Sequence, residues 1–319
     1  MAGADDATTF FLVGTTRSGT SLLGLMLHNH PEIVFPGEFE LAVDFMPSAD
    51  AFPALPDYYE WLSMDRHFRH HAPSIDPALS YPALVRSFLG QMKRDAGGAD
   101  KRLVGAAVHR HFDRLFTLFP AARFIHLVRD PRDVARSWIE FGWSGNAWAA
   151  GREWDALERL WDRVAVAIPP ERVHALRFED LVRDPRGALE AICAFLGVPY
   201  AESMLRYHER STYGPIDPNQ VFKWRTALTP SEQRWIEGVA GEMLVARGYE
   251  RCGLAPKRAG ALGARWLALD DWARRWRARV RRFGFLPWLA DQIAKGMHLE
   301  GVRRRIELRN QAIINRSLK

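Results

Sequence analysis

Apolar residues along this chain form short continuous runs that alternate with longer segments of helical spacing. Four runs have the length and content of buried strands, and they cover residues 10–13, 102–108, 124–128 and 173–178. The segments between and after them predict helices at 22–27, 81–93, 113–119, 133–141, 143–161 and 185–196. Strands that alternate with helices predict an α/β fold, with a mainly parallel central sheet flanked by helices on both faces.

Two other segments have readable signals. Residues 44–81 are rich in Pro, Phe, Tyr and His and show no clear period. They predict loops and short helices that lie over a site at the strand ends. Thr229 stands just before Pro230 and three residues before Glu232, which predicts the N-cap of a late helix.

The C-terminal segment has a different pattern. Its apolar positions recur at alternating steps of three and four, which predicts an amphipathic helix along Trp266, Leu269, Ala273, Trp276, Val280 and Phe283. Gly284 and Pro287 are expected to break this helix, and a second apolar and basic stretch runs over 288–314. We therefore divide the chain into a domain at 1–256 and a basic helical extension at 257–319.

Charge separates these two parts. The formal charge of +6 divides into +11 for residues 257–319 (16 basic and five acidic) and −5 for the remainder (28 basic and 33 acidic). A basic helix with tryptophan on its apolar face can lie on an anionic membrane. The alternative, which we favour, is that the stripe packs on the domain or on a second copy of the chain and leaves its arginines in water.

Composition limits the class of protein. A hydrophobic fraction of 47%, with 12 Trp and 18 Phe, predicts a packed globular protein. Cys193 and Cys252 are too few for a disulfide framework or a cysteine metal site. No run approaches the ~20 apolar residues of a spanning helix, and residues 1–9 lack the features of a secretion signal. We expect a cytoplasmic location, with membrane association through the extension as an alternative, and no nucleic-acid partner.

The first strand leads into a glycine-rich loop, Gly-Thr-Thr-Arg-Ser-Gly-Thr-Ser, at residues 14–21. Its spacing is that of the P-loop G-x-x-x-x-G-K-[ST], but Thr20 stands at the lysine position. The backbone N–H groups and dipole of a helix N-terminus favour an anion, and Arg17 is the cation within this loop. A kinase without the lysine lacks its β/γ-phosphate contact. The loop therefore predicts a phosphate or sulfate site other than that of ATP.

A second basic turn follows the strand at 124–128. It begins at Arg129, continues through Asp130 and Pro131 into a helix, and places Ser137 on the second helical turn. Pro at a first helical position is typical of a helix start. Because ligands of parallel sheets bind at the carboxyl ends of the strands, the two segments together suit a ligand with two anionic groups.

These residues together resemble the sulfotransferases that use 3′-phosphoadenosine 5′-phosphosulfate (PAPS). The likeness is nearest to the bacterial, Golgi and tyrosylprotein branch, which carries Arg-Ser-Gly-Thr in its first loop. Three further matching stretches lie in order along residues 9–250: His30-Pro31-Glu32 with Gly37-Glu38, then Phe178-Glu179-Asp180-Leu181 with Asp184-Pro185 and Phe195-Leu196-Gly197, and then Lys223-Trp224 with Leu228-Thr229. Five motifs in the family's order are a strong signal.

The resemblance implies a P-loop-like fold and PAPS as co-substrate. By this resemblance the 5′-phosphosulfate lies on the first loop, at Arg17, Ser18, Gly19, Thr20 and Ser21. The 3′-phosphate is held by Arg129 and Ser137. Phe178 contacts the adenine, or packs in the core instead. Lys223 and Trp224 form the late basic-Trp element, in which Lys223 reaches a cofactor phosphate or stays in solvent.

The resemblance also implies the catalytic groups. Sulfuryl transfer resembles phosphoryl transfer in requiring position and electrostatic stabilisation, and it requires no metal. Glu38 is the candidate general base, helped by a pKa raised through burial, with Glu40 in reserve. His109 and His111 are alternatives, because a histidine serves in the cytosolic branch. Ala107 replaces a family lysine, so that His109, Arg110 or Arg17 alone must supply its charge.

The leading hypothesis is therefore a sulfotransferase that moves the sulfuryl group of PAPS in line to a hydroxyl or amine. One alternative is a small-molecule P-loop kinase. Another is a non-catalytic, degenerate sulfotransferase fold that binds a membrane or partner through its basic extension. Residues 44–81 and 143–161 are expected to shape the acceptor pocket, and their aromatic content fits a small molecule such as a phenol, a glycan, a lipid or a peptide tyrosine.

Overall fold

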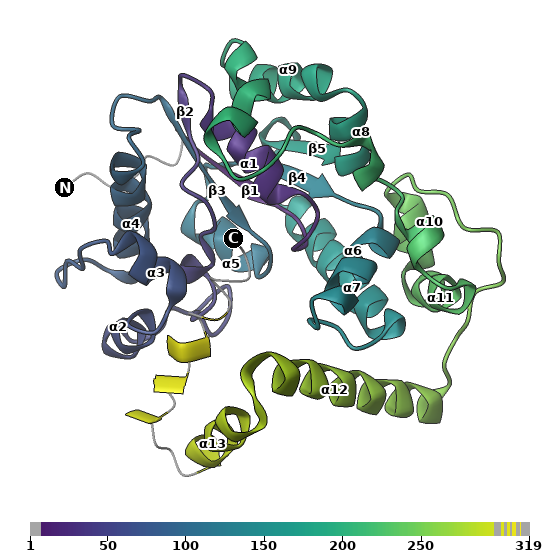
Figure 1. Cartoon of the computed structure of the whole chain (residues 1–319). Coiled ribbons are helices and arrows are strands. Elements are labelled where there is room, and N and C mark those ends of the chain that lie inside the picture. The colour runs from purple at the N-terminus through teal and green to yellow at the C-terminus, as the bar shows by residue number, and fades with distance from the viewer. Residues whose placement is uncertain (1–7, 297–300, 303–304, 307, 311–312, 314–319) are drawn as a thin grey trace.

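A parallel five-stranded sheet lies at the centre of the protein (Figure 1), in the order β2-β3-β1-β4-β5. The computed structural model describes residues 8–296, 301–302, 305–306, 308–310 and 313. The strands are β1 (Thr9–Val13), β2 (Ile33–Val34), β3 (Leu103–Val108), β4 (Arg123–Val128) and β5 (Val173–Arg177). Each neighbouring pair is parallel. The predicted α/β class and parallel sheet are confirmed.

Alternate residues of β1 point into two different cores, which explains why both faces of the sheet are covered. Phe11 and Val13 pack in one core with α2 (Leu55–Leu62), α4 (Tyr81–Asp95) and α5 (Phe112–Leu118). Phe10 and Leu12 pack in the other. Its helices are α1 (Thr20–His28), α8 (Phe178–Arg183), α9 (Pro185–Leu196) and the 3₁₀ segment η4 (Glu202–Arg210). A strand buried on both faces reads as a continuous apolar run, as the sequence of β1 does.

A third cluster extends the fold beyond the carboxyl end of β4. It is built on α6 (Pro131–Glu140) and α7 (Ala147–Ala165), with α10 (Trp224–Ala227) and α11 (Pro230–Ala246) packed against them. In Figure 1 these four helices lie together on the right of the sheet. The remaining described elements are α3 (Arg66–His71), α12 (Ala261–Phe283), α13 (Phe285–Gly296) and the 3₁₀ turns η2 (Glu40–Ala42), η3 (Pro170–Arg172) and η5 (Pro218–Gln220).

The predicted elements agree with the structure in type and differ at some ends. Thr229 forms the predicted N-cap, with a complete capping box to Glu232. Phe178 begins α8 instead of ending β5, because the strand pairing with β4 stops at Arg177. The helix expected from residue 143 begins at 147, where the Asn146 side chain accepts from the N–H of Ala149.

The C-terminal extension contains the predicted helix, and of the two packing partners expected for its apolar stripe the domain covers only part of it. α12 runs along the lower edge of the molecule in Figure 1 and meets the domain at residues 142–146. Trp266 and Leu269 stay 63% and 65% exposed, so this part of the stripe does not pack on the domain. Gly284 ends α12 as expected, whereas Pro287 lies inside α13.

Two predictions, for the N-terminal segment at 1–9 and for the apolar and basic stretch at 288–314, partly concern residues that the structure does not describe. These are residues 1–7 of the N-terminal segment and, within the second basic stretch, 297–300, 303–304, 307, 311–312 and 314. Among the described residues no helix is both long enough and apolar enough to cross a membrane.

Candidate active site

A cavity of about 1840 Å³ opens at the carboxyl ends of β1, β3 and β4. The residues expected at the site that line it are Arg17, Gly19, Thr20, Ser21, Glu38, His109, Arg129 and Phe178. Residues from 44–67 and from 141–153 line it as well, as do Arg282 and Gly301 of the extension. The cavity is larger than the ~300–1,000 Å³ of a usual ligand pocket, so it has room for two ligands side by side.

The glycine loop is held in shape by its own side chains and by α6. Trp138 Nε1 donates to Thr16 Oγ1 at 2.9 Å, and the Thr15 and Ser18 hydroxyls are 2.6 Å apart. Gly19 has φ +97°, and a Cβ there would collide with the Phe178 ring. Because Leu23 makes the first helical bond of α1, back to Gly19, the N–H groups just before it are free to meet an anion.

Ser18 does not line the cavity, although the resemblance placed it among the residues that hold the 5′-phosphosulfate. Its N–H donates to the Thr15 carbonyl at 3.2 Å, its hydroxyl pairs with Thr15, and it is fully buried outside the cavity lining. Ser18 therefore stabilises the shape of the loop, and its N–H and hydroxyl are not free to bind an anion.

Arg17 reaches across to α6. Its Nε donates to Ser137 Oγ at 2.9 Å, and its guanidinium lies 4.5 Å from the centre of the Phe141 ring. The residue adopts φ +71°, a backbone conformation that is uncommon outside glycine and often occurs at functional sites. Ser137 itself is buried behind Arg17 and does not line the cavity. The two predicted anion-binding segments are thus joined by a direct hydrogen bond.

Arg129 lies between the loop and the adenine-contacting candidate Phe178. Its guanidinium donates to the carbonyls of Arg17 at 3.1 Å and Gln220 at 2.6 Å, and it stacks 4.3 Å from the Phe178 ring centre. Only 9% of the residue is exposed, and Nε has no described hydrogen-bond partner. Burial lowers the pKa of Arg129, although Asp133 and Glu179 oppose the shift. Among the described residues no carboxylate forms an ion pair with Arg129, so this buried cation lacks a direct counter-ion.

Trp224 and Lys223 take structural positions. Trp224 is 6% exposed, and the Arg132 guanidinium lies 3.7 Å from the centre of its ring, while the backbone N–H of Trp224 donates to Asp133 Oδ1. Lys223 Nζ donates to Gln220 Oε1 at 2.9 Å. Neither lines the cavity. Trp224 therefore supports the turn that carries Arg129. Lys223 holds the side chain of Gln220, whose carbonyl accepts a hydrogen bond from Arg129.

A buried ionic network anchors the same turn. Arg132 binds Asp130 Oδ2 at 2.7 Å and Glu237 Oε1 at 2.7 Å, and all three residues are at most 3% exposed. Removing one partner from such a network leaves an uncompensated buried charge. The network connects α6 to α11 and so holds the N-terminus of α6 in place.

We expect Glu237→Ala to lower the free energy of unfolding by about 3–5 kcal/mol, because Arg132 loses one of its two carboxylates. Equilibrium urea unfolding measures this loss. Glu202→Ala is the matched control: Glu202 pairs with Arg186 at 2.6 Å, but both side chains are more than half exposed, so its loss should be below about 1 kcal/mol. Equal effects of the two substitutions would contradict a structural role for the buried network.

A carboxylate, an imidazole and a hydroxyl form a buried chain that ends at the glycine loop. Glu40 Oε1 is hydrogen-bonded to His109 Nδ1, and His109 Nε2 lies 2.9 Å from Thr20 Oγ1. Burial opposes charge on the imidazole, but the Glu40 carboxylate outweighs it and raises the pKa of His109. The chain thus places against Thr20, which occupies the lysine position of a P-loop, an imidazole whose protonated form is favoured by the Glu40 carboxylate.

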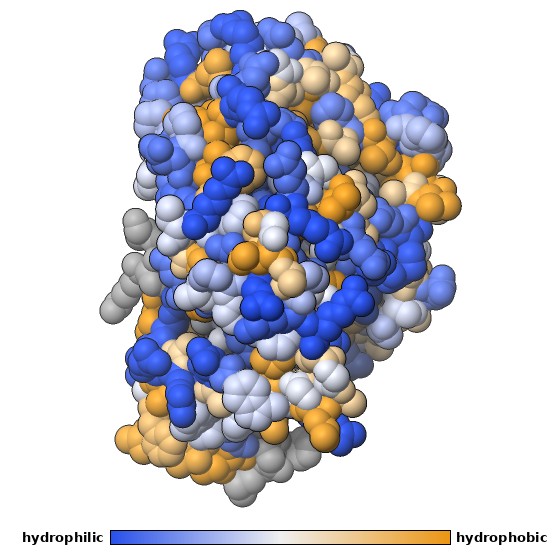
Figure 2. Space-filling model, turned by 90° about the vertical axis from the view of Figure 1, so that its right-hand side faces the viewer, coloured by the Kyte–Doolittle hydropathy of each residue, from blue (hydrophilic) through white to orange (hydrophobic). Residues whose placement is uncertain are grey.

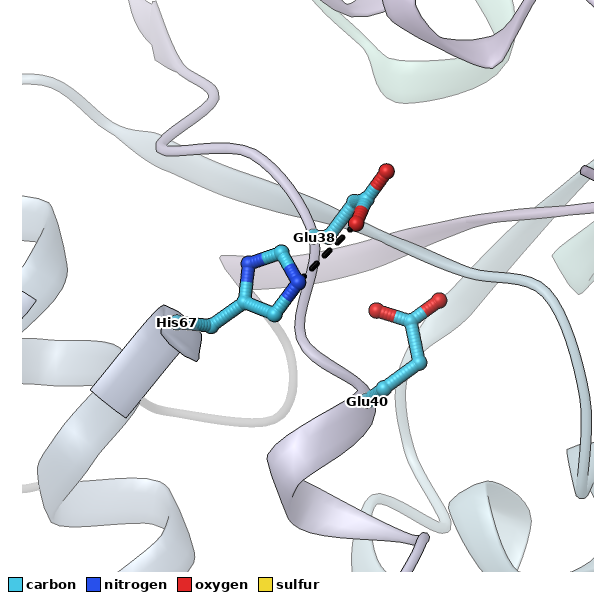
Figure 3. A group of neighbouring side chains, drawn as sticks. All are labelled: Glu38, Glu40 and His67. Atoms are coloured by element: carbon cyan, nitrogen blue, oxygen red, sulfur yellow. Dashed lines mark ion pairs between the residues drawn. The ribbon is translucent and has the colours of Figure 1, made fainter. Parts of the chain in front are cut away.

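Glu38 is paired with two side chains of α3, Arg66 and His67, and Figure 3 shows His67 pointing toward it. Arg66 Nη2 donates to Glu38 Oε2 at 2.8 Å, and His67 Nε2 lies 3.0 Å from the same oxygen. Burial would raise the pKa of Glu38, but the hydrogen bond to His67 and the charges of His109, His67 and Arg66 lower it to about 2. The expectation that the pKa of Glu38 is raised is therefore wrong. Glu38 lines the cavity as an ionised carboxylate.

The side chains of Glu38, Glu40 and His67 converge closely enough to suggest a metal site. Their ligand atoms lie within 4.8 Å of one another, and in Figure 3 both carboxylates project into the same space. However, Arg66 already occupies the Glu38 oxygen that faces His67. This Glu38 oxygen is therefore already engaged by the Arg66 guanidinium.

Sequence reasoning missed the residues that define the electrostatics of Glu38. Arg66 and His67 stand in the region expected to cover the site, but no spacing pointed to a partner 28 residues away. Glu153, which lines the cavity from α7, was also missed, and burial raises its pKa. For Glu153 the available signal was a charged residue within a helix that was already expected to shape the acceptor pocket.

Comparison with known proteins settles the family. The sequence model described as the Sulfotransferase family matches residues 9–202, more than half of the chain. The chain belongs to the sulfotransferase family. Nodulation protein NoeE of Sinorhizobium fredii is 27% identical over 300 residues, which cover 76% of this chain and 66% of NoeE. Carbohydrate sulfotransferase 6 of Homo sapiens is 24% identical, with 78% of this chain and 82% of that protein covered.

Other similar proteins share shorter regions or the fold. The omega-hydroxy-beta-dihydromenaquinone-9 sulfotransferase Stf3 of Mycobacterium tuberculosis is 29% identical over 158 residues, 45% of this chain and 40% of Stf3. The sulfotransferase domain of the Synechococcus PCC 7002 olefin synthase superposes with a TM-score of 0.59 at 24% identity, over 75% of this chain and 96% of that one. This sulfotransferase thus has the P-loop-like fold of solved family members.

Proposed function

We propose that this sulfotransferase moves the sulfuryl group of PAPS to a hydroxyl or amine of an acceptor bound in the same cavity. The observation that carries the proposal is Arg129, a buried guanidinium at the cavity wall with an unpartnered Nε and no described counter-ion. A buried charge is stable only when it is paired. The 3′-phosphate of the nucleotide supplies that pair.

Two other groups complete the nucleotide site in this proposal. The free N–H groups at the start of α1 receive the 5′-phosphosulfate, and Arg17, tethered to Ser137, lies between the two anionic positions. Phe178 offers one ring face to Arg129 and lines the cavity beside Gly19. An aromatic face in this position suits stacking of the adenine base.

His109 replaces the family lysine that is Ala107 here. Charge develops on the bridging phosphate oxygen as the sulfuryl group leaves, and a preorganised donor stabilises it. The imidazolium, oriented by Glu40 and hydrogen-bonded to Thr20, is the cation that can meet this charge. Glu38, ionised and facing the cavity, remains the proposed acceptor of the hydroxyl proton, although its low pKa makes it a weak base.

The walls of the cavity suit an acceptor with both polar and apolar surface. Aromatic side chains line it together with several carboxylates, and the aromatic ones include Phe45, Trp61, Phe141, Trp143 and Tyr213. The similar proteins carry names that refer to carbohydrate, tyrosine and menaquinone acceptors. We therefore keep small-molecule, glycan, lipid and peptide acceptors as candidate substrate classes.

The nucleotide is tested by thermal unfolding with PAPS, with adenosine 3′,5′-bisphosphate and with Mg-ATP at matched concentration. A ligand at ~100 times its Kd adds about 2.7 kcal/mol to the native state. We expect both 3′-phosphorylated nucleotides to raise Tm and Mg-ATP not to. A shift with Mg-ATP alone would instead support a kinase, and no shift with any nucleotide would support a non-catalytic fold.

A further inference from the structure

α12 is attached to the domain through the side of the helix that carries its two aspartates. Asp271 Oδ1 accepts from the N–H of Gly145 at 2.6 Å, and Asn146 Nδ2 donates to the Leu267 carbonyl at 2.8 Å and to Asp270 at 3.0 Å. The helix approaches so closely that a Cβ at Gly145 would collide with the backbone of Asp271. These contacts fix which side of α12 faces the domain.

The apolar stripe therefore faces away from the domain. A helix turns by about 100° per residue, so Leu269 and Asp271 lie on opposite sides of α12. We define the outer surface by six exposed apolar residues of the extension: Leu262, Trp266, Leu269 and Trp272 on α12, with Phe285 and Leu286 on α13. Their exposed fractions run from 50% to 80%. Figure 2 shows hydrophobic side chains gathered along the lower edge of the molecule, at the height of α12 and α13 in Figure 1.

α13 continues this surface. Trp276, on the stripe one turn after Trp272, packs edge-on against Trp288 with ring centres 5.6 Å apart. Trp272 and Trp276 stack at 6.5 Å. The aromatic contacts join the two helices while Phe285 and Leu286 stay exposed. A contiguous exposed apolar surface of this kind marks an interaction site.

Positive charge flanks the outer surface. α12 contains seven arginines and two aspartates. Both aspartates are engaged, with Arg274 and Arg275 respectively. Arg265, Arg277 and Arg279 are exposed, and by helical geometry Arg277 and Arg279 lie on either side of the outer surface while Arg265 lies between Leu269 and Trp272. Apolar residues bordered by free cations match an anionic lipid surface, into which tryptophan inserts and to which arginine is attracted.

A second copy of the chain fits this surface less well. Two-fold association would place the same patch against itself, and the arginines of one copy would then face those of the other. Like charges opposed at an interface are unfavourable. We propose that the outer surface of α12 and α13 binds the surface of an anionic membrane, and that the helices lie on the bilayer.

The proposal is tested by co-sedimentation of the full chain with vesicles of phosphatidylglycerol and phosphatidylcholine, and with vesicles of phosphatidylcholine alone. We expect binding to the anionic vesicles that weakens as salt is raised. Trp266→Ser/Leu269→Ser/Trp272→Ser should reduce the binding at least about tenfold. Val166→Ser/Val245→Ser, which removes two exposed aliphatic side chains of the catalytic domain, is the matched control and should bind like wild type.

A charge variant keeps the test informative if the triple serine variant folds poorly. Arg265→Glu/Arg277→Glu/Arg279→Glu retains the apolar residues and should lose binding to anionic vesicles. Wild-type protein that fails to bind anionic vesicles would overturn the proposal. So would a wild-type dimer in sedimentation velocity that the triple serine variant dissociates, because the outer surface would then be covered by a second copy.

Discussion

Arg129→Ala is expected to abolish measurable sulfuryl transfer and to weaken binding of adenosine 3′,5′-bisphosphate by about 10²–10³-fold. Truncating one partner of a buried, hydrogen-bonded charge pair costs about 2–5 kcal/mol, and Arg129 is the buried cation without a described counter-ion at the cavity wall. Isothermal titration calorimetry measures the loss of affinity. Arg163→Ala, at an exposed position on α7, is the matched control and should bind normally.

The same variant distinguishes a 3′-phosphate contact from general damage to the site. Adenosine 5′-phosphosulfate lacks the 3′-phosphate, so its affinity should be nearly equal in wild type and in Arg129→Ala. The wild type should prefer PAPS, and the variant should not. Folding is checked by thermal unfolding without ligand, where loss of an unpaired buried charge should not lower Tm greatly. If the variant still preferred PAPS, the assignment of Arg129 to the 3′-phosphate would be wrong.

His109→Gln is expected to lower kcat by about 10²–10³-fold while changing nucleotide affinity little. The glutamine can keep a hydrogen bond near Thr20 but carries no positive charge, and removing one preorganised stabilising group of this kind costs about that factor. Steady-state kinetics with a saturating nucleotide measures the effect. His174→Gln, on β5 and outside the cavity lining, is the matched control.

Glu40→Gln separates a charge role of His109 from a packing role. Burial opposes protonation of His109 and the Glu40 carboxylate raises its pKa, so a neutral glutamine should let that pKa fall. If the imidazolium is the active form, activity is retained below the folded pKa and lost as pH rises through it. The alkaline limb of the kcat profile should therefore move to lower pH in Glu40→Gln. An unmoved limb would exclude His109 as the titrating group.

Much of the fold could be predicted because its signals are local. The run at residues 10–13 is apolar on both sides, and alternate residues of β1 do pack in two cores. The Thr229 capping box needs only residues three apart, and it forms as expected. The glycine loop was recognisable from its spacing, and the turn at Arg129 from the proline that follows it.

The arrangement within the site could not be predicted in the same way. Thr20, Glu40 and His109 come from three separate segments. The pairing of β1 with β3 and the bridge between Glu38 and Ala107 bring them together. The pKa of Glu38 depends on α3, whose Arg66 and His67 approach through tertiary contact. A burial argument from sequence gives the wrong sign there, because it omits those cations.

The sequence by itself determined the parallel α/β fold, the two basic turns at the strand ends and the amphipathic character of α12, because each depends on the spacing of residues along one segment. Only the tertiary structure decided which predicted residues face the cavity. In the folded chain Ser18 pairs with Thr15 and Trp224 packs against Arg132, so neither faces the cavity, whereas Arg129 is a buried cation at the cavity wall. It also decided the side of α12 that meets the domain, because the hydrogen bonds of Asp271 and Asn146 fix the helix by its polar side and leave the tryptophans outside.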